Sequence, residues 1–245
     1  VFALCGDGLR GKARAVLVTF AGAVSFLVHG TKSLCGIGRR GGVNDWVFRF
    51  RVVLCVAAFL LLLSEELLRR PGEYRRGREY LFLGGVTVAA ALYGVVHDFV
   101  TWSICPGYFV AGKGIPQASS GFTKDVVVLA MKATWYAGLL TGAVLLIANN
   151  RDRLSCQLGY GTLVKMALIP LGISMLMEGI VGIAFGCFAK EVADGSGFDV
   201  CYERFGARFF VVWGMHLGAY LGGAIGLAIA FFVTVSKKRN LSGAK

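Results

Sequence analysis

The feature that most constrains the fold of this chain is a series of apolar segments, each long enough to cross a lipid bilayer. A membrane-spanning helix needs about 20 mainly apolar residues. Such segments recur along the 245 residues, at 13–30, 52–68, 80–103, 126–148, 162–187 and 209–235. Backbone polar groups must be hydrogen-bonded inside lipid, so each segment is predicted to be an α-helix. The sequence therefore predicts an all-α, polytopic transmembrane helical bundle of about six spans, with residues 1–245 forming a single integral membrane domain.

The first two segments are shorter than the others and could be tilted or partly interfacial. Residues 13–29 also resemble the apolar part of a signal peptide, but no A-x-A cleavage site follows them. We therefore interpret this segment as a retained span.

The positions of lysine and arginine predict the orientation of the bundle. The net charge is +12, but the basic residues lie mainly in short segments beside apolar runs, which is typical of membrane topology and not of nucleic-acid binding. Basic segments occur at 10–14, 69–79, 151–153 and 237–239. All four can lie on the same side of the membrane if the number of spans is even. That side, with both termini, is predicted to be cytoplasmic. Residues 31–51 disagree, because five lysines and arginines would then be external, so this segment is either outside or re-entrant.

The last apolar segment carries a glycine at every fourth position. The row consists of Gly214, Gly218, Gly222 and Gly226. Such a row lets a neighbouring helix approach closely, which favours helix association in lipid. The row is predicted to be a packing face, and the partner helix belongs either to this chain or to another subunit.

Three ionisable residues lie at a similar depth in three different spans: Lys132, Glu178 and His216. At 1.5 Å per residue, each is roughly 10–14 Å below the predicted external surface. Ionisable residues inside a membrane are candidates for function, because they are costly to bury. A two-residue offset rotates a helix by about 200°, so His216 is predicted to point away from the glycine row.

Further polar residues could complete this buried polar cluster. Tyr220 shares a helical face with His216, and His97 and Asp98 lie near the end of the third span. One interpretation is structural, with an ion pair between Lys132 and Glu178 that fixes the helix register. A second is a transport path or proton relay. A third is a metal site built from His97, Asp98, Glu178 and His216, which offers suitable ligand types but no diagnostic spacing.

The cysteines allow one covalent prediction. Cys105 and Cys201 would both be external, so they could form a disulfide if that side is oxidising, the alternative being free thiols. The sequence contains no C-x-x-C pair, so a cysteine-based zinc or iron–sulfur site is not expected.

Three stretches of the chain carry a resemblance to a known family. They read YGVVHDFVTWSICPGYF from Tyr93, KATWYAGLLTGAVL from Lys132 and WGMHLGAYLGGAIG from Trp213. In this order they resemble a family of uncharacterised bacterial multi-pass membrane proteins with an H-D-x-V-T…C-P-x-Y-F motif and a late H-x-x-x-Y helix. The matching positions are His97, Asp98, Thr101, Cys105, Pro106, Tyr108, Phe109, Trp135, His216 and Tyr220.

The chain also departs from this family. Gly107 replaces a family glutamate, so any chemistry that the carboxylate performs would be lost; Phe99 and Val110 replace a glutamine and a threonine. The resemblance implies a bacterial-type membrane setting and no particular activity.

The sequence contains no P-loop or G-x-S-x-G pattern, and no catalytic residue or cofactor is predicted. The first expected function is an accessory or structural subunit of a larger membrane complex, whose partners are the lipid bilayer and other membrane proteins. The alternatives are a small transporter or channel that uses Lys132, Glu178 and His216, or a metal-dependent membrane enzyme. The expected location is a bacterial inner membrane or an equivalent organellar inner membrane.

Overall fold

The computed structural model describes residues 75–115, 121–149 and 157–243, together with the single positions Phe50, Val53, Ala57 and Ser64. The predictions for residues 13–30 and 31–51 lie outside the described residues, except for Phe50, and so does most of the predicted span 52–68. In the three described ranges, all the regular elements are helices.

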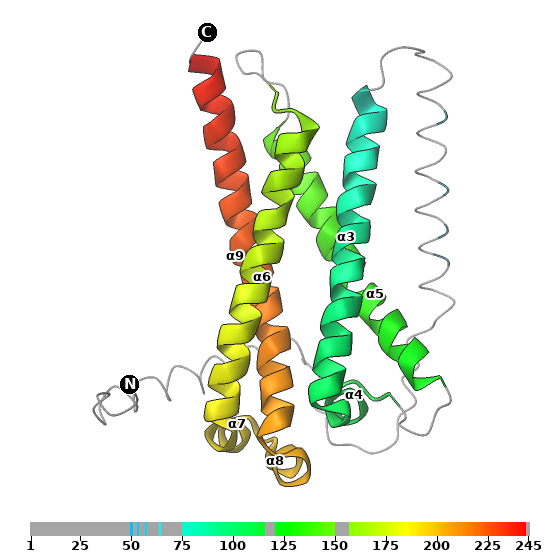
Figure 1. Cartoon of the computed structure of the whole chain (residues 1–245), viewed down its shortest axis with the longest axis vertical. Helices are drawn as coiled ribbons and strands as arrows, with labels where there is room; N and C mark the ends of the chain where they lie inside the picture. The colour runs from blue at the N-terminus through cyan, green and yellow to red at the C-terminus, as the bar shows by residue number, and fades with distance from the viewer. Residues whose placement is uncertain are drawn as a thin grey trace, which may run out of the picture. The chain divides into compact units, whose positions relative to one another are not determined.

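Four of these helices are long: α3 (Arg75–Ile104), α5 (Phe122–Ala148), α6 (Tyr160–Cys187) and α9 (Ala207–Gly243) (Figure 1). Each contains a stretch long and apolar enough to cross a membrane. They coincide with the last four predicted spans, so the described part of the chain is an all-helical membrane protein with four candidate spans. Both α3 and α9 extend beyond their apolar stretches, because lysine and arginine are good helix formers and continue the helix.

Three short helices occupy the connections that follow α3 and α6: α4 (Pro106–Ala111), α7 (Ala189–Ser196) and α8 (Asp199–Phe205). Proline suits the first turn of a helix, and Pro106 begins α4. Gly197 ends α7 with a left-handed φ of 73°, a conformation that glycine adopts without strain. The sequence does not predict these helices, since such short helices have no clear hydrophobic periodicity.

Towards its C-terminal end, α3 exposes apolar side chains and buries polar ones. The exposed positions, spaced by four, are Val88, Leu92, Val96 and Val100. The buried positions include His97, Asp98 and Thr101. This distribution is the reverse of that of a surface helix in water, and it is expected where lipid surrounds a helix and polar groups face the protein interior.

The described chain divides into two compact units. The first contains Val100–Phe122 and Met175–Leu221, and the second contains residues 75–99, Thr123–Ser174 and residues 222–243. The second unit has an apolar core made by Phe82, Leu145, Leu163 and Ala230.

Close glycine contacts join α6 and α9 within each unit. In the first, a Cβ added to Gly214 would lie 2.6 Å from the carbonyl oxygen of Val181. In the second, a Cβ on Gly222 would lie 2.6 Å from the carbonyl oxygen of Ile173. These distances are shorter than van der Waals contact, so the two helix backbones touch only because α9 has no side chains there.

Candidate metal-binding site

His97 and Asp98 lie together on the buried face of α3, in the second unit. The Nε2 atom of His97 is 3.9 Å from Oδ1 of Asp98, an ion pair when the imidazole is protonated. Tyr93, one turn earlier on the same helix, places its ring centroid 6.0 Å from that of His97. An imidazole and a carboxylate are thus held side by side in the buried part of an apolar helix.

His216 lies on α9, in the first unit, inside a shell of aromatic rings. Its imidazole is stacked on Tyr108, with the ring centroids 4.9 Å apart and an interplanar angle of 18°. Phe109 presents its ring at 73° to the imidazole, with the centroids 6.2 Å apart. His216 is 6% exposed, so its imidazole is removed from the surrounding solvent or lipid.

The short helix α4 brings Tyr108 and Phe109 to this position. The backbone N–H of Cys105 donates to the carbonyl of Thr101 at 3.0 Å, and the N–H of Tyr108 donates to the carbonyl of Cys105 at 3.1 Å. The chain therefore turns directly from the end of α3 into α4. The N–H of Ile115 donates to the carbonyl of Phe109 at 3.0 Å and closes the segment that follows α4.

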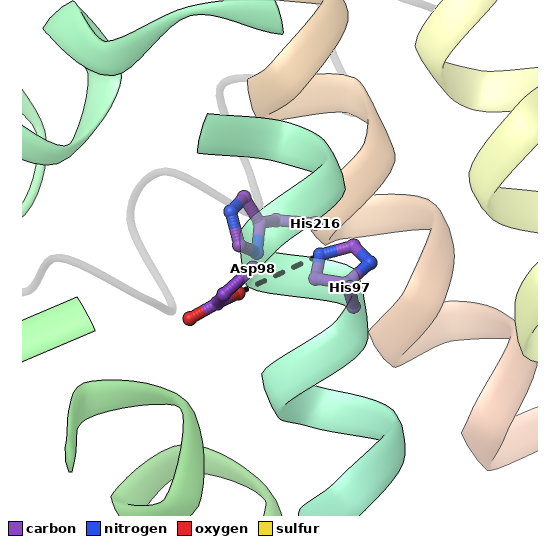
Figure 2. A group of neighbouring side chains, drawn as sticks. All are labelled: His97, Asp98 and His216. Atoms are coloured by element: carbon purple, nitrogen blue, oxygen red, sulfur yellow. Dashed lines mark ion pairs between the residues drawn. The ribbon is translucent and has the colours of Figure 1, made fainter. Parts of the chain in front are cut away.

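His97, Asp98 and His216 form a group of neighbouring side chains (Figure 2). One ligand atom from each of the three residues lies within 4.8 Å of the other two. Two imidazoles and one carboxylate are a ligand set that proteins use for zinc and for non-haem iron.

Glu178, the other residue of the predicted metal site, is not part of this group. The Cα of Glu178 lies 2.8 Å from the position of a Cβ on Gly218, so the backbone of α6 at Glu178 packs against the glycine row. Lys132 is partly buried in α5. Tyr220 is 45% exposed, one turn beyond the buried His216.

The two predicted disulfide partners, Cys105 and Cys201, are both buried, and no disulfide bond joins them in the described residues. Removal of the thiol from solvent raises the pKa of Cys105 above its ordinary value, and this outweighs the lowering by backbone hydrogen bonds from Tyr108 and Gly107 and by the charge of Arg208. A thiol with a raised pKa stays protonated and is a poor metal ligand.

Gly107, where the resemblance implies a glutamate, has a structural explanation. A Cβ at this position would collide with the ring of Phe205. The first unit therefore has an aromatic ring in the space that a side chain at position 107 would need.

The sequence did not predict the contacts of Tyr108 and Phe109 with His216, although both belong to the C-P-x-Y-F stretch that carries the resemblance. Their one signal is the position of two adjacent aromatic residues directly after the Cys-Pro-Gly turn.

Comparisons with protein-family models, with curated proteins and with solved structures find no match to this chain. The resemblance to the bacterial membrane family accordingly stays a prediction.

Proposed function

We propose that this chain is an integral membrane protein that binds one divalent transition-metal ion through His97, Asp98 and His216. The observation that carries the proposal is the grouping of these two imidazoles and one carboxylate, all buried, within 4.8 Å. The ligand types favour Zn²⁺ or Fe²⁺. Three protein ligands leave at least one coordination position for water or a substrate, which is the arrangement of a catalytic metal site and not of a structural one.

The energetics of burial support the same proposal. A carboxylate inside a membrane protein is costly unless a positive charge or hydrogen bonds compensate it. A divalent cation beside Asp98 would be attracted by the negative charge of its carboxylate, and two neutral imidazoles would complete its coordination without adding charge. The apolar outer face of α3 would keep the site away from lipid.

The topology and location that we propose follow from the charge pattern. The basic segments at 10–14, 69–79, 151–153 and 237–239 favour about six spans with both termini in the cytoplasm. The Cys105 end of α3 would then lie towards the external side. The resemblance favours a bacterial-type inner membrane. A metal-binding protein can also be a subunit of a larger membrane complex. Native co-purification with retained partners tests that role.

Metal analysis of the purified protein tests the function. The wild-type chain should retain one equivalent of zinc or iron after dialysis, and His97→Ala, Asp98→Asn and His216→Ala should each lose it. Glu178→Gln is the matched control, because it removes an intramembrane charge outside the group and should leave the metal in place. A wild-type protein that binds no metal after loading, or ligand variants that retain it, would disprove the proposal.

Glu178→Gln also tests the transporter that the sequence suggests. Unchanged ion or proton flux through reconstituted vesicles would remove that alternative.

A further inference from the structure

We propose that Tyr108 is a positioning residue for the metal site, holding the imidazole of His216 by ring stacking in the orientation that metal binding requires. This inference rests on the proposed metal-binding function and assigns a role to α4, a helix that supplies no ligand.

The geometry of the stack supports this role. The ring centroids are 4.9 Å apart and the planes are nearly parallel, at 18°. This arrangement lies within the range that stacked rings prefer. Phe109, which is fully buried, meets the imidazole at 73° and limits its movement from another direction. Two rings with different orientations therefore enclose the imidazole.

Tyr108 is itself held in place. Its ring contacts Phe209 with the centroids 5.4 Å apart, and the Nζ of Lys113 lies 5.6 Å from the ring centroid. Its backbone N–H donates to Cys105, and its carbonyl accepts from the N–H of Gly112 at 2.7 Å. Tyr108 is 5% exposed. A ring with contacts on so many sides is a rigid surface on which another ring can be oriented.

Stacking addresses a specific weakness of histidine as a ligand. Rotation about χ2 of histidine is soft, so the directions of its two nitrogens are poorly defined. Most metal-binding histidines overcome this with a hydrogen bond from the nitrogen that does not bind the metal. A parallel ring restricts the same rotation, because turning the imidazole out of the stacking plane would bring it into collision with Tyr108.

A comparison of ring-retaining and ring-removing variants tests the inference. Cobalt(II) is titrated into purified full-length protein, and both its affinity and its visible absorption spectrum are recorded. Tyr108→Phe keeps the stacked ring and should bind cobalt within about twofold of wild type with the same spectrum. Tyr108→Leu and Tyr108→Met remove the ring and should lower the affinity about 10–100-fold, as loss of a ligand-orienting group does elsewhere, with an altered spectrum.

Tyr202→Leu is the matched control. It removes another tyrosine of the first unit, whose ring contacts Phe210 and not a histidine, and it should bind cobalt as wild type does. If Tyr108→Leu or Tyr108→Met binds cobalt with the affinity and spectrum of the wild type, the inference is overturned. The proposed metal site would not be affected by that result. Equal losses in Tyr108→Phe and Tyr108→Leu would also overturn it, because the hydroxyl would then be the important group. A wild-type protein that binds no cobalt would overturn both proposals.

Discussion

On α9, the side that carries Gly214 and Gly218 lies against the backbone of α6, whereas the side that carries His216 lies against the aromatic rings of α4. Close packing fully explains the glycine side, because any side chain there would collide with α6. It does not explain a buried imidazole, since an apolar residue would fill the same space without the penalty of burying a polar group. The comparison teaches that close packing accounts for the glycine side, whereas the His216 side fits the binding role that we propose for it.

The largest expected effect is on the glycine side. A Cβ on Gly218 would collide with the carbonyl of Met177, and a backbone group cannot move aside as a flexible side chain can. We expect Gly218→Leu to lower the free energy of unfolding by about 3 kcal/mol, the upper part of the range for overpacking. Reversible unfolding in mixed detergent measures this change.

Gly179→Leu is the control, because no atom lies within 4 Å of a Cβ at that position on α6. It should be neutral or slightly stabilising. Equal destabilisation by the two variants would show that the glycine contact with α6 is not what matters.

The next effect is on the opposite side of the same helix. His216→Leu should weaken metal binding by about 100-fold or more, since even the loss of a group that orients a ligand costs 10–100-fold. The metal-free variant should be at least as stable as metal-free wild type, because the leucine removes a buried polar group. Metal titration measures the affinity, and unfolding of the metal-free protein measures its stability. A large loss of stability without metal would mean that His216 is a packing residue.

A smaller effect is expected where α4 meets α8. A Cβ at position 107 would collide with Phe205, whose ring can move, so Gly107→Ala should lower the free energy of unfolding by about 2 kcal/mol. The double variant with Gly107→Ala and Phe205→Ala should lose less free energy of unfolding than the sum of the losses in the two single variants. Gly121→Ala, at a position with open space, is the control. Additive losses would refute the proposed contact.

The smallest effect concerns the thiol at the start of α4. Burial raises the pKa of Cys105 above its ordinary value, and the thiolate is the reactive form. At neutral pH, Cys105 should react with a maleimide at least about tenfold more slowly than the exposed Cys187, and its rate should keep rising at higher pH than that of an ordinary thiol. Mass spectrometry of the two peptides follows the reactions. Equal rates would indicate that α4 does not shield this end of α3.

The sequence predicts the long helices well because span length is a direct consequence of bilayer thickness. It misses α4, α7 and α8, which are too short for hydrophobic periodicity to show. Depth along a helix was enough to single out His216 and Glu178 as costly residues. Depth does not give the rotation of one helix against its neighbour, so it could not separate Glu178, beside the glycine row, from His216. The stack on Tyr108 depends on tertiary packing and has no signal in the spacing of residues.

X-ray absorption at the edge of the bound metal tests the central claim most directly. For the wild-type protein, the account predicts a first shell of nitrogen and oxygen at about 2.0–2.2 Å, with the multiple-scattering pattern of two imidazoles. His216→Leu should reduce that pattern to one imidazole or lose the metal. A sulfur neighbour at about 2.3 Å, or a spectrum that His216→Leu leaves unchanged, would contradict the account.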